Sequence, residues 1–175
     1  MAEFGFFVGR MNPIHIGHEA VINRMIEMCG IEHSVIVIGS CNAPASIRHF
    51  FSYNERRNFI RQLYPTVRIV GLPDYLTDEE WLRALYDLME AITGTSKPGQ
   101  IKFFGGAEDE VQWYIDAGHQ VEVLNRFDGT TPIVSATEVR DHLIQAKSLE
   151  GLINPELIDP IQELFKQRWD AFKQL

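Results

Sequence analysis

The sequence has little of several features that define whole classes of protein. Its 175 residues include 2 cysteines, Cys29 and Cys41, which are too few for a disulfide framework and indicate reduced thiols in a cytosolic protein. No apolar run approaches the roughly 18 residues that a membrane-spanning helix needs. The first residues carry an acid and no basic segment, so we expect no signal peptide. These features predict a cytoplasmic protein that is not embedded in a membrane.

Basic residues are also fewer than acidic residues in this sequence. The chain has 16 Lys and Arg against 24 Asp and Glu, which gives a formal net charge of −8. This balance excludes a generally basic nucleic-acid-binding protein, although it is compatible with a local basic pocket. Internal repeats, low-complexity segments and long linkers are absent from the sequence as well. We therefore expect one unit over residues 1–150, with a helical C-terminal extension of the same domain at 151–175.

Short apolar runs alternate with segments of helical periodicity along the chain. The apolar runs predict strands at residues 4–8, 34–38, 67–72, 101–104 and 120–124. Helices are expected at 16 to about 29, 52–63, 77–92, between the last two strands, 135 to about 146, and 155–175. Within the last of these, Pro160 marks either a break or a second start. Three helices open with the capping box S/T-x-x-E, at Ser52, Thr77 and Ser135.

The alternation of strands and helices predicts an α/β fold. We expect a Rossmann-like, doubly wound parallel sheet with helices on both faces and a helical C-terminal tail. Ligands of such sheets bind at the carboxyl ends of the strands, at a topological switch point. Residues that directly follow the strands are therefore the first candidates for function.

The loop after the first strand carries the main chemical signal. His15 and His18 are three residues apart at the start of a helix, so they lie on one face of its first turn. Gly17 between them lets a ligand approach the backbone, and Arg10 and the free N–H groups of the helix start add positive charge. This combination suits a polyphosphate. Two alternatives are weaker: separate core, capping and surface residues, or a zinc site without H-E-x-x-H and with both cysteines far away.

These residues carry a resemblance to a known family. The pattern H-x-G-H after the first strand is the signature of the HIGH-type nucleotidyltransferase superfamily, and residues 134–140 resemble its second signature, I-S-x-T-x-x-R. The chain is most similar to archaeal-type nicotinamide mononucleotide adenylyltransferases. Four stretches carry that resemblance. The first is residues 8–15, and the second is 38–40 followed by 46–48 and 51–56. The third is 73–74 followed by Trp81, and the fourth is 135–140. The chain departs from the family at Asn12, where Gln is common, and in the acidic loop 105–110.

The resemblance implies an activity and a set of site residues. The reaction is transfer of AMP from ATP to nicotinamide mononucleotide by direct in-line attack, which gives NAD and pyrophosphate. Mg²⁺ is expected as cofactor, held mainly by the phosphates and by no protein ligand. The implied catalytic residues are His15, His18 and Arg140. ATP and its phosphates are expected at Gly9, Arg10, Gly17, Gly106, Ser135 and Thr137, and the mononucleotide at Gly39, Ser40, Arg48, Asp74 and Trp81.

Several of these residues also have a purely structural interpretation. Trp81 has the helical spacing of a core residue. Arg48 can be a plain solvated residue of its loop, and Asp74 can be a turn residue or a helix cap. Gly39 and Ser40 suit a tight turn, and Ser135 is expected to cap its helix in either case. The other tryptophans, Trp113 and Trp169, are expected in the core or at an interface.

Other functions are compatible with the same signature. The acceptor could instead be nicotinic acid mononucleotide or phosphopantetheine, and CTP could replace ATP. A non-catalytic nucleotide sensor is a second class, but it predicts damaged transfer residues, and His15, His18 and Arg140 are intact. A class I tRNA synthetase fragment should carry a K-M-S-K-S-like loop, which this sequence lacks. The sequence leaves the formation of a homo-oligomer open.

Overall fold

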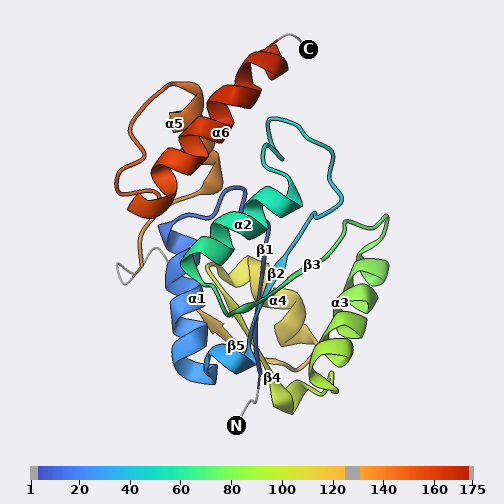
Figure 1. The fold of residues 1–175 in the computed structure, drawn as a ribbon. Helices are drawn as coiled ribbons and strands as arrows, with labels where there is room; N and C mark the ends of the chain where they lie inside the picture. Colours follow the sequence, from blue (N-terminus) through green and yellow to red (C-terminus); the bar gives the residue numbers. More distant parts are fainter. Residues whose placement is uncertain (1–3, 125–130, 174–175) are drawn as a thin grey trace.

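The computed structural model describes residues 4–124 and 131–173. Its described part contains a five-stranded parallel sheet in the order β3-β2-β1-β4-β5 (Figure 1). The strands are β1 (Phe4–Gly9), β2 (Ser34–Ile38), β3 (Arg68–Gly71), β4 (Ile101–Gly105) and β5 (Gln120–Val123). β1 lies between β2 and β4, with Phe7 opposite Ile36 on one side and Phe104 on the other. The chain therefore winds from β1 toward one edge and then from β4 toward the other, so the switch point lies between β1 and β4.

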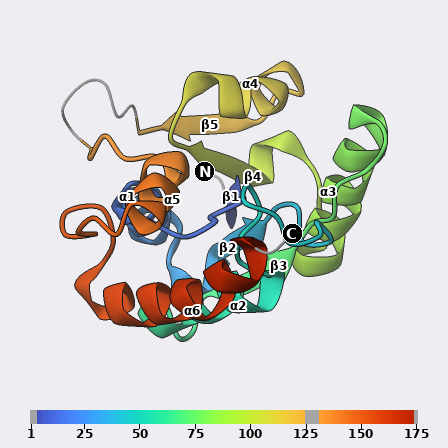
Figure 2. The same ribbon diagram turned by 90° about the horizontal axis from the view of Figure 1, so that it is seen from above.

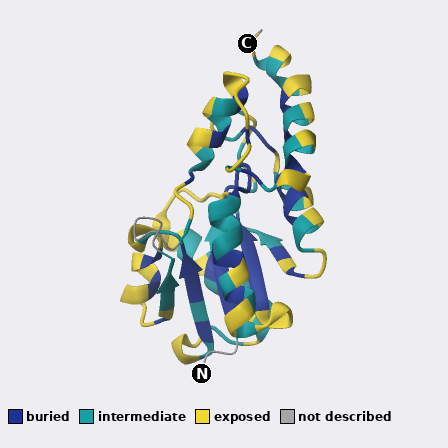
Figure 3. Cartoon of the chain, turned by 90° about the vertical axis from the view of Figure 1, so that its left-hand side faces the viewer, coloured by how far each residue is buried: buried dark blue, intermediate teal, exposed yellow. Residues whose placement is uncertain are grey.

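Helices cover both faces of this sheet (Figure 2). They are α1 (Ile16–Cys29), α2 (Tyr53–Leu63), α3 (Asp78–Thr93), α4 (Glu108–Asp116), α5 (Ala136–Ile144) and α6 (Pro155–Lys173), with short 3₁₀ turns at Ile31–His33 and Pro98–Gln100. Side chains alternate along each strand, so Phe7 and Phe104 join a core with α1, α2, α5 and α6, whereas Phe6 and Phe103 join a core with α3 and α4. Figure 3 shows the strands as the most buried layer. The doubly wound fold expected from the sequence is confirmed.

The predicted strand limits are within one residue of those observed. At the three predicted capping boxes, the side chain of the first residue does cap its helix. The hydroxyl oxygens of Ser52, Thr77 and Ser135 accept hydrogen bonds from backbone N–H groups three residues later, at 3.2, 3.2 and 3.1 Å. In α2 the Glu55 carboxylate also accepts from the Ser52 N–H at 3.0 Å. The capping signal therefore located these three helices correctly.

Pro160 neither breaks the C-terminal helix nor starts a second one, since α6 continues through it. Proline has no N–H, so the carbonyl of Glu156, four residues earlier, loses its usual partner within the helix. The side-chain amide of Gln62 in α2 donates to that carbonyl at 3.3 Å. A contact from a neighbouring helix thus supplies the hydrogen bond that the sequence removes.

The extension at 151–175 packs on the same core as the rest of the chain. Phe165 of α6 lies 4.7 Å from the Phe50 ring and 5.3 Å from the Trp169 ring, between ring centroids. Arg168 donates to the Phe50 carbonyl at 3.0 Å and to the Glu55 carboxylate at 2.7 Å. These contacts hold α6 against the loop before α2, above the carboxyl ends of the strands (Figure 1). No helix in the described ranges is both long and apolar enough to span a membrane.

Candidate functional site

A cavity of about 500 Å³ lies beyond the carboxyl ends of the strands, at the switch point between β1 and β4. Every residue singled out from the sequence lines it, so segments that are far apart in the chain meet there. The residues are Gly9, Arg10, His15, Gly17, His18, Gly39, Ser40, Arg48, Asp74, Trp81, Gly106, Ser135, Thr137 and Arg140. What each of them does to a ligand stays a prediction.

His15 and His18 close the N-terminus of α1 by a reciprocal exchange of hydrogen bonds. The Nδ1 atom of His15 accepts from the N–H groups of Gly17 at 3.1 Å and His18 at 3.3 Å. In return, the Nδ1 atom of His18 accepts from the N–H of His15 at 3.1 Å. The sequence alternative of a capping histidine is therefore correct for His15, which is 6% exposed.

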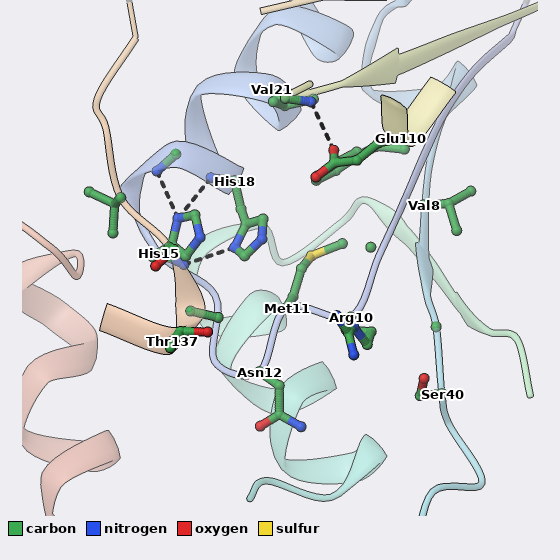
Figure 4. A pocket seen from close by; sticks show the side chains of 18 of the residues that line it. Val8, Arg10, Met11, Asn12, His15, His18, Val21, Ser40, Glu110 and Thr137 are labelled. Carbon is green, nitrogen blue, oxygen red and sulfur yellow. Dashed lines mark hydrogen bonds between the residues drawn. The ribbon is translucent and has the colours of Figure 1, made fainter. Parts of the chain in front are cut away.

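This exchange fixes the chemistry of the two rings. They stack with centroids 3.6 Å apart and an angle of 21° between their planes (Figure 4). Because Nδ1 is the acceptor in each ring, the neutral imidazole carries its proton on Nε2. Both histidines are thus held as Nε2–H donors at a helix N-terminus, an arrangement that suits phosphate oxygens.

Gly17 is needed for the position of the His15 ring. A Cβ atom at residue 17 would lie 2.9 Å from Cε1 of His15 and 3.1 Å from its Nδ1 atom, closer than such contacts normally come. The sequence suggested that this glycine lets a ligand approach the backbone. The structure adds that it makes room for the capping ring.

Three arginines converge on the same cavity. Arg140, in α5, donates from Nη1 to the Asn12 carbonyl at 2.8 Å and from Nη2 to the Thr137 hydroxyl at 3.3 Å. Burial, followed by the positive charges of Arg10 and Arg48, lowers the pKa of Arg140. Like charges gathered in this way favour an anionic ligand. The α5 N-terminus faces the cavity too, through Thr137 and its neighbours.

The sequence analysis missed two polar residues that hold the loops around the cavity. Asn12 is 2% exposed, and its side chain accepts from the Phe51 N–H at 3.0 Å and donates to the Phe51 carbonyl at 3.2 Å. Arg56 is 2% exposed and donates to the carbonyls of Arg10 at 2.7 Å, Gly39 at 2.9 Å and Ser40 at 3.1 Å. Burial lowers the pKa of Arg56. Its place in the helix that follows a capping box was the one signal in the sequence.

The cavity lining also includes aromatic and acidic side chains. The Ser40 hydroxyl donates to the Asp74 carboxylate at 2.9 Å, and Thr77, not Asp74, caps α3. Trp81 is half-buried, packs partly on the core beneath α3 and lines the cavity. Its ring meets Trp113 edge to face, with centroids 5.9 Å apart and planes at 89°. Trp113 is 41% exposed, so of the two alternatives expected for it, core or interface, the core is excluded.

Carboxylates and other metal ligands are not gathered at this site. Within residues 4–124 and 131–173, no group of three or more His, Cys, Asp or Glu is arranged to hold a metal ion. The cavity instead offers N–H donors and guanidinium groups. Its chemistry therefore suits an anionic ligand, and aromatic side chains also line it.

Comparisons with known proteins identify the family and the fold. The cytidylyltransferase-like family matches the chain over residues 6–142. A nicotinamide-nucleotide adenylyltransferase from Thermococcus sibiricus is 29% identical over 167 residues, which cover 91% of this chain and 83% of that protein.

Two solved structures share the fold. One is a bifunctional NMN adenylyltransferase/ADP ribose pyrophosphatase from Francisella tularensis, complexed with AMP and a manganese ion, with a TM-score of 0.73 and 21% identity. The match covers 95% of this chain and 52% of the Francisella chain, so this chain spans about half of that protein. The other is a nicotinic acid mononucleotide adenylyltransferase from Plasmodium falciparum complexed with NaAD. It matches with a TM-score of 0.60 and 14% identity, and the match covers 99% of this chain and 98% of that chain.

Proposed function

The chain belongs to the cytidylyltransferase-like family, and on that basis we propose that it is a nicotinamide-nucleotide adenylyltransferase. It transfers AMP from ATP to nicotinamide mononucleotide and releases pyrophosphate. One observation carries the proposal: a single cavity is lined by histidine and guanidinium groups that suit phosphates, together with Trp81 and Asp74. A nucleoside triphosphate and a pyridine mononucleotide together offer phosphates, a flat cationic ring and hydrogen-bonding groups for these side chains.

The reaction needs positioning more than it needs a base. The attacking group is a phosphate oxygen of the mononucleotide, which is already an anion near neutral pH. It displaces pyrophosphate from the α-phosphorus of ATP, so one P–O bond forms while another breaks. Charge develops on the bridging and non-bridging oxygens during this exchange, and preorganised donors stabilise it.

We assign the donors of the cavity to this exchange. The Nε2–H groups of His15 and His18, at the start of α1, would bind the phosphates on which charge develops, and His18 is the best candidate for stabilising that charge. Arg140 supplies a guanidinium for the β- and γ-phosphates, with Thr137 beside it. Arg10 and Arg48 line the same cavity and supply charge for the remaining phosphates.

We place the acceptor base against Trp81. The Trp81 ring offers a flat surface to the cationic pyridine ring, an arrangement in which an aromatic face attracts positive charge. Asp74, fixed by Ser40, is an acceptor for the ribose or the carboxamide. Gly39 and Ser40 directly follow β2 and line the cavity beside Asp74.

A divalent metal fits this site as a companion of ATP. The described residues form no metal cage, and Mg²⁺ typically binds through substrate phosphates and water. When bound, it neutralises charge on the pyrophosphate that leaves. Arg10, His15 and His18 would contact the phosphate oxygens that the metal leaves open. The two cysteines are free, and we place the enzyme in the cytoplasm, with neither nucleic acid nor membrane as a partner.

The test is an acceptor panel. The protein is incubated with ATP and Mg²⁺ together with nicotinamide mononucleotide, nicotinic acid mononucleotide or phosphopantetheine, and pyrophosphate and the adenylylated product are measured. We expect NAD and pyrophosphate in equal amounts, and none from an Arg140→Ala variant of unchanged melting temperature. Product from phosphopantetheine with none from either mononucleotide would show that the acceptor is wrong. A protein that binds ATP and forms no product would instead be a nucleotide sensor.

A further inference from the structure

The C-terminal helix α6 lies near the cavity without lining it. The last residue in the described lining of the cavity is Arg140, which precedes α6 in the chain. Arg168 of α6 nevertheless reaches the loop before α2, at the carboxyl ends of the strands (Figure 1). Its guanidinium stands over the ring of Phe50, 5.9 Å from the ring centroid. Arg168 thus joins α6 to a loop that borders the site.

The two hydrogen bonds of Arg168 are charge-assisted and partly shielded from water. Its Nη1 atom donates to the Phe50 carbonyl at 3.0 Å and to Oε1 of Glu55 at 2.7 Å. The side chains of Arg168 and Glu55 are 30% and 17% exposed. Hydrogen bonds of ionised groups are roughly twice as strong as neutral ones, and salt screens partly buried pairs less than exposed ones. This contact can therefore hold the backbone of the loop in one position.

Arg168 and Glu55 bind one side of the two peptide groups that flank Phe51. The carbonyl of the first group accepts from Arg168, and the N–H of the second donates to Oε1 of Glu55 at 3.0 Å. The opposite sides of both groups bind the Asn12 side chain. The Phe51 N–H donates to its Oδ1 atom at 3.0 Å, and the Phe51 carbonyl accepts from its Nδ2 atom at 3.2 Å. Because a peptide group is planar, a partner on one side fixes the direction of the other side, so Arg168 helps to hold Asn12.

Asn12 in turn orients Arg140. Asn12 is 2% exposed and lies in the loop between β1 and α1. Its backbone carbonyl accepts from Nη1 of Arg140 at 2.8 Å, and Nη2 of Arg140 donates to the Thr137 hydroxyl at 3.3 Å. Asn12 and Thr137 both line the cavity (Figure 4). A displacement of Asn12 would therefore move one of the two acceptors that direct the Arg140 guanidinium within the site.

We propose that Arg168 is a positioning residue for the transfer reaction and that it acts on Arg140 through Asn12. The inference rests on the proposed function, in which Arg140 binds the β- and γ-phosphates of ATP. The mononucleotide has neither of these phosphates, so the loss of Arg168 should affect ATP more than the acceptor. A purely structural role of α6 predicts a different result. The free energy of unfolding would then fall, while the folded protein would bind and convert both substrates as before.

The experiment compares four variants of the full chain with the wild type. Arg168→Met removes both hydrogen bonds and keeps a long side chain, whereas Arg168→Lys keeps a charged donor. Lys166→Met removes the same charge from an exposed position of α6. Ile161→Ala weakens the packing of α6 through a side chain that is buried in the core. For each protein, melting temperature, Kd for ATP without acceptor, KM for both substrates and kcat are measured, the last two from pyrophosphate release with Mg²⁺.

We expect Arg168→Met to lower kcat/KM for ATP by about 3- to 30-fold, the range for a mutation that acts through a network of contacts. Kd and KM for ATP should rise more than KM for the mononucleotide. Arg168→Lys should recover most of the loss, and Lys166→Met should behave as the wild type. Ile161→Ala should lower the melting temperature and leave the kinetic constants of the folded protein unchanged. If Ile161→Ala lost as much kcat/KM for ATP as Arg168→Met, fold stability would explain the effect and the proposal would be overturned.

A double-mutant cycle tests the route of the effect. If Arg168 acts through Arg140, Arg168→Met should reduce kcat/KM for ATP much less in an Arg140→Lys protein than in the wild type. In a Trp81→Ala protein it should reduce kcat/KM by the full factor, because Trp81 lies on α3, outside this series of hydrogen bonds. The same reduction in all three proteins would exclude the route through Arg140.

The positioning role and the proposed function fail in different ways. Wild-type kinetic constants in Arg168→Met would overturn the positioning role and leave the transfer reaction intact. A wild type that released no pyrophosphate would overturn the proposed function, and the Kd for ATP would then decide the positioning role. A Kd raised by Arg168→Met and unchanged by Lys166→Met would support that role, whereas equal values in both variants would overturn it.

Discussion

Replacing His15 by asparagine separates two roles that the structure assigns to one ring. The Nδ1 atom of His15 caps α1 by accepting from Gly17 and His18, while its Nε2–H is a candidate phosphate donor. Asparagine is among the best residues at a helix N-cap, and its side-chain oxygen can accept the same N–H groups. It cannot extend a second donor into the cavity from the position of Nε2. Alanine removes both functions.

The expected magnitudes differ enough to be measured. Loss of the cap in His15→Ala costs about 1 kcal/mol, which lowers the melting temperature of a chain of this size by roughly 2–4 °C. Loss of one donor to developing charge costs about 10²–10³ in kcat. We therefore expect His15→Asn to keep the wild-type melting temperature and still lose about as much kcat as His15→Ala.

The assay compares thermal unfolding and steady-state kinetics on the same preparations of wild type, His15→Asn and His15→Ala. Melting temperatures are measured without substrate, so that ligand binding does not mask the loss of the cap. If His15→Asn retained wild-type kcat, the ring would be a helix cap alone and the assignment of its Nε2–H would be refuted. If His15→Asn melted as low as His15→Ala, the capping argument would be wrong.

Three further outcomes follow from the geometry. His18→Ala should raise the barrier for kcat by about 2–4 kcal/mol while ATP affinity changes much less, and an unchanged kcat with weakened ATP binding would contradict the assigned role. Trp81→Ala should raise KM for the mononucleotide, since stacking of a base is worth roughly 1–3 kcal/mol, with KM for ATP nearly unchanged; a large fall in melting temperature with an unchanged acceptor KM would place Trp81 in the core instead. Burial lowers the pKa of His119 in the folded chain, so the unfolded chain binds a proton at His119 more readily. The stability that neutral His119 allows is therefore fully present above about pH 6.5, the ordinary pKa of histidine, and is lost as the pH falls through the lower pKa of the folded chain. His119→Gln should therefore lose less melting temperature than wild type between about pH 7.5 and pH 5, and equal losses would exclude His119 as the source.

The sequence predicted the fold well because local signals dominate it. The β-branched and aromatic runs are short and continuous, as befits strands that are buried on both faces. The hydroxyl caps at Ser52, Thr77 and Ser135 need only their own helices, so they could be recognised without tertiary information. The candidate site followed from the rule that ligands gather at strand ends, and the residues chosen on that rule do meet in one cavity.

The features that the sequence did not reveal depend on neighbours distant in sequence. Pro160 stays within a helix, and Gln62, from α2, donates to the carbonyl that proline leaves without its helical N–H partner. Trp113 of α4 is 41% exposed and meets Trp81 of α3 edge to face. The sequence placed Arg56 in a helix but did not show that its guanidinium is buried against three carbonyls. In each case the deciding partner lies in another element.

These long-range contacts explain how a site built from loops can be ready before its ligands arrive. The segment between β1 and α1 is held from two sides: Arg56 binds the carbonyl of Arg10, and Arg140 binds the carbonyl of Asn12. The Asn12 side chain adds a two-way pair with the Phe51 backbone. The loop is thus fixed by side chains from α2 and α5, so the histidines at its end need little rearrangement. For a reaction whose nucleophile is already charged, such preorganised donors are the main contribution that a protein can make to the rate.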